Sequence, residues 1–258
     1  MNYRYIFVVF LFVFLPLNCF ADVYTAAQIV IAATRQKIPL IINRPAVIGA
    51  RDDRFYFEER PGLDVIWDQQ EARQQSIILE TYFERLALQR RQALLHDLSQ
   101  IHQRHPGALD DDIVRYLDHL NTVLARMNAG LVYRKGACGH LASVSAAFAI
   151  VLEIAGRIEI IQLKDKLDGH AFVVLNRPLS STLSSLSTWG EAVILDAWSM
   201  EGEANGVYDL TNLPLVLSQK KWTSWKSIEV SYPQGRAFHP EVVKLIRKFY
   251  WEMKVLLG

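Results

Sequence analysis

A single cysteine remains in this chain once its N-terminal leader is removed, and this limits how an exported protein can be stabilised. That residue is Cys138, while the other cysteine, Cys19, lies within the leader. A lone thiol cannot form an internal disulfide, so the fold has to be stabilised by a packed hydrophobic core. An unpaired thiol in such a protein also indicates either a reactive group or a disulfide between two chains.

The first 21 residues have the features of a cleavable signal peptide. Arg4 supplies positive charge, residues 6–15 are apolar, and Cys19 and Ala21 occupy the positions where signal peptidase requires small side chains. The apolar run is shorter than the ~20 residues that a membrane-spanning helix needs, which disfavours an uncleaved anchor. We therefore expect cleavage after Ala21, a secreted or periplasmic location, and no stable membrane insertion afterwards.

The mature chain, residues 22–258, is long enough to bury a full hydrophobic core. Loss of Arg4 with the leader brings the 28 basic residues level with the 27 acidic residues. A net charge near zero disfavours a nucleic-acid binder, because such proteins carry a basic excess. The composition leaves the oligomeric state open.

The spacing of apolar residues predicts helices in the first part of the chain and strands in the second. We expect helices over residues 23–37, 68–102, 110–127, 138–155 and 239–254. We expect strands over residues 158–163, 171–175, 192–197, 206–210 and 227–232, with a further short strand at 40–42. Residues 128–137 are predicted to be a connecting loop, and Gly156 is predicted to end the helix that begins at Cys138.

This order of elements indicates an α+β fold. An N-terminal helical hairpin precedes a helix that starts at Cys138 and packs on an antiparallel sheet. The predicted organisation is a signal peptide (1–21), a helical N-terminal region (22–130) and a catalytic region (131–258). We expect the last two regions to form one compact unit.

Three residues in the second half of the chain have the chemistry of a nucleophilic triad. Cys138 starts its helix between two glycines, and a helix N-terminus stabilises a thiolate. His170 opens a strand, and Asp196 ends an apolar strand where an unpaired carboxylate would be costly. A histidine on the neighbouring strand would satisfy Asp196 and be oriented by it. The alternatives are a buried structural cysteine and a structural histidine.

These residues lie in three short motifs: residues 136–140 (GACGH), 169–174 (GHAFVV) and 194–198 (ILDAW). Together the motifs resemble the papain-like and transglutaminase-like cysteine superfamily, and especially bacterial effector and toxin domains of the glutamine-deamidase type. The resemblance covers about sixty residues and implies Cys138 as nucleophile, His170 as general base and acid, and Asp196 as the group that orients the histidine. The chain departs from that group at Ala137, His140 and Ala197, which leaves the substrate type open.

The expected function is that of a secreted cysteine-dependent amide hydrolase or acyltransferase acting on a protein or peptide. Deamidase, transglutaminase and peptidase activities all fit, because they differ only in the groups that enter and leave. The alternatives are a secreted interaction protein whose triad is degenerate and a dimer linked through Cys138.

No cofactor or metal is expected from the sequence. The spacing of His102 and His105 allows metal binding, but a third ligand is not evident and a solvated helix end is the favoured interpretation. Nothing in the sequence has the pattern of a glycine-rich phosphate-binding loop.

Overall fold

The computed structural model describes residues 23–42, 64–66, 69–166, 169–199, 205–218, 221–233 and 235–258. The predicted signal peptide, with Cys19, and residues 43–63 of the irregular segment lie outside these described residues. In chain order the larger elements are α1 (Val23–Lys37), β1 (Leu40–Ile42), β2 (Asp64–Ile66), α4 (Gln69–Arg104), α5 (Asp111–Tyr133), β3 (Lys135–Gly136), α6 (Cys138–Val151), β4 (Ile158–Lys164), β5 (Gly169–Leu175), β6 (Val193–Leu195), β7 (Val207–Tyr208), α7 (Leu215–Ser218), β8 (Ser224–Glu229) and α8 (Pro240–Leu257).

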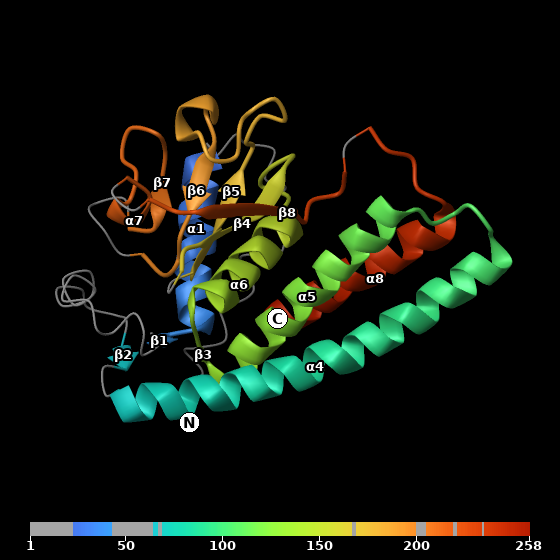
Figure 1. Cartoon of the computed structure of the whole chain (residues 1–258), viewed down its shortest axis with the longest axis horizontal. Coiled ribbons are helices and arrows are strands. Elements are labelled where there is room, and N and C mark those ends of the chain that lie inside the picture. The colour runs from blue at the N-terminus through green and yellow to red at the C-terminus, as the bar shows by residue number, and fades with distance from the viewer. Residues whose placement is uncertain are drawn as a thin grey trace, which may run out of the picture.

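The fold is mixed α+β, as the sequence predicts, with an antiparallel five-stranded sheet in the order β7-β6-β5-β4-β8. The long helices α4 and α5 form the expected hairpin, and α8 lies alongside them (Figure 1). Helix α6 lies between this bundle and the sheet, contacting α5 and α8 on one side and β4 and β5 on the other. Within the described residues, no helix combines the length and apolarity that crossing a bilayer requires.

One hydrophobic core joins the helices to the sheet. Strand β5 directs alternate side chains to opposite faces, so that Val173 packs toward the helices and Phe172 packs toward the other face. Helix α6 is buried on nearly all sides, with Val144 and Ala147 among its fully buried residues. This helix is therefore enclosed between two layers of the fold.

Three predicted elements have wrong boundaries: the strand expected over 227–232 is β8, Ser224–Glu229, and two helices end elsewhere than predicted. Helix α5 continues to Tyr133, through residues that were expected to form a loop, and ends at Arg134 with φ at 51°. Gly130 does not break the helix, because it serves close packing: a Cβ at Gly130 would lie 2.7 Å from Cδ1 of Ile38. Helix α6 ends at Val151 rather than before Gly156, and Glu153 takes the left-handed conformation.

A small parallel sheet, absent from the prediction, fixes the chain just before Cys138. Strand β1 pairs with β2 on one side and β3 on the other, in the order β2-β1-β3. Its residue Ile41 is in register with Gly136, two positions before Cys138. The start of α6 is therefore fixed by a strand from the N-terminal part of the chain.

Gly136 leaves no room for a side chain beside α6. A Cβ at Gly136 would lie 2.6 Å from Cβ of His140, an atom held by the helix backbone, so Gly136→Ala should lower the free energy of unfolding by about 1–3 kcal/mol. Gly139→Ala is the matched control, since a Cβ there meets nothing within 4 Å. Urea unfolding of both variants tests this, and equal stability of the two would contradict the packing argument.

Candidate functional site

Cys138 is the first residue of α6 and lies at the surface end of that helix. It is a free cysteine, and its side chain is half-buried. Its Sγ lies 3.9 Å from the carbonyl oxygen of Gly169, the residue that precedes His170 on β5. The sulfur is thus accessible to solvent and lies beside the strand that carries the histidine.

The first turn of α6 presents backbone amides next to this sulfur. The first N–H groups bonded within the turn are those of His140 and Leu141, which both donate to the carbonyl oxygen of Ala137. The N–H groups of Cys138 and Gly139 precede these and have no acceptor within the helix. Ala137, the N-cap residue, has no polar side chain with which to cap them. They are therefore suitable donors for a developing oxyanion at an atom bonded to Sγ.

His170 and Asp196 form a buried pair. Nε2 of His170 lies 2.6 Å from Oδ2 of Asp196, and the two residues are 5% and 1% exposed. Strands β5 and β6 are adjacent and antiparallel, as predicted, and Asp196 follows the last residue of β6. With Nε2 engaged by the carboxylate, Nδ1 is the ring nitrogen that remains for the thiol.

The carboxylate is fixed at its second oxygen as well. Oδ1 of Asp196 accepts hydrogen bonds from the backbone N–H groups of Trp198 and Ser199, each at 3.2 Å. The Trp198 ring packs edge-on against the His170 ring, with centroids 5.2 Å apart. The Phe172 ring stacks on the His170 ring, with centroids 5.8 Å apart. Aromatic rings therefore limit the access of water to the pair.

The electrostatics of the site favour a charged imidazole. Burial of His170 lowers its pKa, but the charge of Asp196 and the hydrogen bond to it act in the opposite direction. A hydrogen bond and a charge interaction with Cys138 add to this, and the net effect raises the pKa of His170 to about 10. The imidazole thus pairs with Asp196, and Cys138 lies beside the strand that carries it, with Sγ 3.9 Å from the carbonyl oxygen of Gly169.

The other histidines considered from the sequence lie elsewhere. His140 is buried, and its ring packs edge-on against Phe83 of α4. Within the described residues, His102 is exposed and no group of three or more His, Cys, Asp or Glu side chains is arranged to hold a metal ion.

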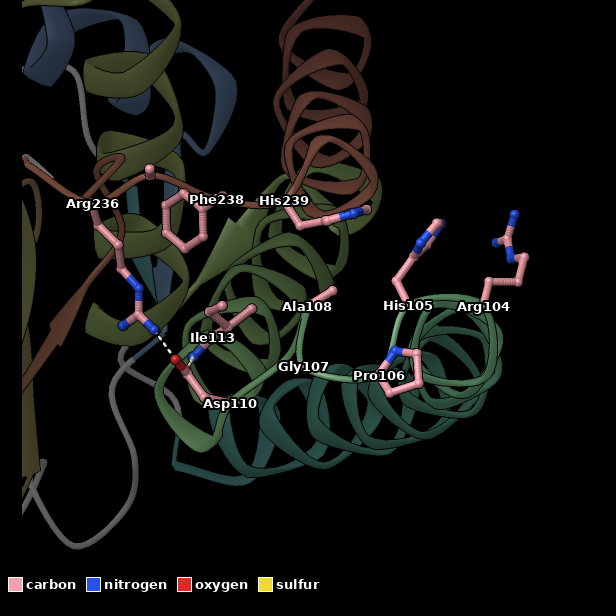
Figure 2. Close-up of a pocket in the computed structure, with 11 residues that line it drawn as sticks. Arg104, His105, Pro106, Gly107, Ala108, Asp110, Ile113, Arg236, Phe238 and His239 are labelled. Carbon is pink, nitrogen blue, oxygen red and sulfur yellow. Dashed lines mark hydrogen bonds and ion pairs between the residues drawn. The ribbon is translucent and has the colours of Figure 1, made fainter.

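The far end of the helical bundle carries a wide hollow of about 730 Å³. Figure 2 shows Arg236 reaching Asp110, and the rings of His105 and His239 lying together on the other side of the hollow. The lining residues come from the turn between α4 and α5 and from the chain before α8. None of them belongs to the cysteine site.

Two side chains of α1 that support the site were not among the residues predicted from the sequence. Thr34 bonds to α6, and Arg35 bonds to the chain that follows Asp196. A threonine and an arginine in the last turn of a helix give no signal of such contacts, because basic residues are common at helix C-termini.

No protein-family model matches this chain, and neither a curated protein nor a solved structure is similar to it. The geometry of the site and the sequence motifs are therefore the features that bear on function.

The His170–Asp196 pair should make stability depend on pH. The folded-state pKa of His170, about 10, lies above the ordinary value of 6.5, so its contribution is complete below pH 6.5 and is lost as the pH rises toward 10. The free energy of unfolding of the wild type should fall across this range by up to about 1.4 kcal/mol per pH unit more than that of His170→Gln. Urea unfolding at a series of pH values measures the difference, and parallel curves for the two proteins would contradict it.

Proposed function

We propose that this chain is a cysteine-dependent amide hydrolase or acyltransferase of the papain-like and transglutaminase-like type, acting on protein or peptide substrates. The observation that carries the proposal is the imidazole of His170, which hydrogen-bonds Asp196 through Nε2 and lies on the strand where Sγ of Cys138 is 3.9 Å from the carbonyl oxygen of Gly169. A helix that starts at the cysteine and packs on an antiparallel sheet supports it further.

In the proposed reaction, the proton of Cys138 already resides on Nδ1 of His170, in line with the raised pKa of the imidazole, and the thiolate Sγ attacks the carbonyl carbon of a carboxamide. The N–H groups of Cys138 and Gly139 stabilise the oxyanion of the tetrahedral intermediate. When this intermediate collapses, the C–N bond breaks, the imidazolium protonates the departing nitrogen, and a thioester remains on Cys138.

Water or an amine then resolves the thioester. His170, now neutral, accepts a proton from the incoming nucleophile, which attacks the thioester carbonyl carbon. The C–S bond breaks, and the proton remains on the imidazole beside the thiolate. Asp196 keeps the imidazole oriented and stabilises its charged form through both proton transfers. We expect hydrolysis of the thioester rather than transfer of its acyl group to an amine, because water is always present.

The secreted or periplasmic location remains a prediction from the leader sequence. It is compatible with the proposed chemistry, since a single free thiol can persist in an oxidising compartment when the mature chain offers it no partner cysteine.

Product analysis tests the reaction. Candidate proteins and glutamine-containing peptides incubated with the wild type should release ammonia or yield new peptide termini, and Cys138→Ala should release neither. His170→Ala should lower kcat by about 10²–10⁴-fold, because it removes the general base and acid. Arg90→Met, which removes an arginine that pairs with Glu252 in the helical bundle, away from the site, serves as a control for folding and handling.

Alkylation of Cys138 distinguishes the proposed enzyme from the interaction protein and the disulfide-linked dimer, and it needs no known substrate. Iodoacetamide should modify wild-type Cys138 rapidly below neutral pH, and His170→Ala should abolish that acid-side reactivity. Slow labelling with ordinary thiol pH dependence in both proteins would support an interaction protein with a degenerate triad. A dimer on non-reducing electrophoresis that disappears in Cys138→Ala would identify an intermolecular disulfide instead.

A further inference from the structure

Two neighbouring residues in the last turn of α1 contact two different parts of the proposed site. Oγ1 of Thr34 lies 3.0 Å from Oγ of Ser145 on α6, and both residues are fully buried. Consecutive residues of a helix point about 100° apart, so Arg35 faces a different neighbour. That neighbour is the chain after Asp196.

The guanidinium of Arg35 holds this chain at several points. Its Nε donates to the carbonyl oxygen of Ala197 at 3.2 Å, and its Nη2 donates to that of Ser199 at 2.7 Å. Its Nη1 donates to both the backbone oxygen and Oδ1 of Asn205, at 3.1 and 2.6 Å. The planar guanidinium, with its five N–H donors, therefore hydrogen-bonds both the segment that leaves β6 and the segment that leads into β7.

These contacts bear directly on the carboxylate of Asp196. Its Oδ1 is oriented by the N–H groups of Trp198 and Ser199, and Arg35 bonds the carbonyl oxygens of Ala197 and Ser199 in the same short segment. Displacement of this segment would therefore turn the carboxylate away from His170.

Gly206 shows how closely the guanidinium and the segment are packed. A Cβ at this position would lie 2.8 Å from Nη2 of Arg35 and 2.8 Å from the carbonyl oxygen of Asp196. Its φ of +92° is also one that residues with side chains rarely adopt. The returning chain passes against Arg35 only because this residue is a glycine.

We infer that Arg35 is a positioning residue for the cysteine site: it holds the segment that orients Asp196, while Thr34 ties the same helix to the helix of Cys138. This inference rests on the proposed function for its catalytic consequence. Helix α1 thereby joins the helix of the nucleophile to the segment of the orienting carboxylate.

The test measures the titration of His170 by NMR of histidine-labelled protein, with His170→Gln used for assignment. In Arg35→Met the titration midpoint should fall by about one pH unit or more from the wild-type value, because the carboxylate is less well oriented. Arg35→Lys keeps the positive charge but loses the planar set of N–H donors. In this variant the titration midpoint of His170 should therefore fall in the same direction but by less. Arg90→Met is the matched control: it removes a half-buried arginine that pairs with Glu252 in the bundle, away from the site.

With an active substrate, Arg35→Met should lower kcat by up to about 100-fold and leave KM unchanged, because a misplaced group affects the chemical step. Cooperative thermal unfolding shows that each variant is folded, and if Arg35→Met does not fold, Arg35→Lys decides the outcome. A folded variant with the wild-type His170 titration would overturn the inference. Slow, ordinary labelling of wild-type Cys138 would instead overturn the proposed function, whereas the effect of Arg35 on the titration would stand.

Discussion

The hydrogen bond between His170 and Asp196 is the interaction on which the rest of the site depends. Both side chains are almost fully buried, and neither could lie there alone without a large desolvation cost. Asp196 therefore stabilises the charged form of His170, and the bond leaves Nδ1 of the imidazole for the thiol. The pairing of β5 with β6 brings the two residues together at one end of the sheet.

The position of α6 explains why the thiol lies near the surface, beside the buried pair. The helix is enclosed by the bundle and the sheet, so its direction is set by packing on several sides. Its first residue lies just after β3, which β1 holds in register at Gly136. The body of the helix is thus buried, while its amide-rich N-terminus and Cys138 remain accessible beside Gly169. This arrangement combines a rigid scaffold with a half-buried thiol at the start of a helix.

Much of the fold follows from local patterns. Alternating apolar residues predicted all the strands of the five-stranded sheet, and helical periodicity predicted α1, α4 and α8 close to their observed bounds. The errors arose where a glycine was interpreted as a helix stop. Gly130 is inside α5 because Ile38 packs against its surface, and this contact lies about ninety residues away in sequence. No local rule distinguishes a packing glycine from a terminating one.

The sequence by itself determined the elements, the α+β class and three candidate side chains, because a lone cysteine at a helix start and a carboxylate after an apolar strand each carry a local physical signal. Only the tertiary structure decided that His170 meets Asp196 with Cys138 beside their strand, and that Thr34 and Arg35 bond to the surrounding segments from α1. The physical reason is that such contacts join residues distant in the chain, 26 positions apart for His170 and Asp196 and 111 for Thr34 and Ser145. A helix-ending arginine acquires its role only from the carbonyl oxygens that the fold places around its guanidinium.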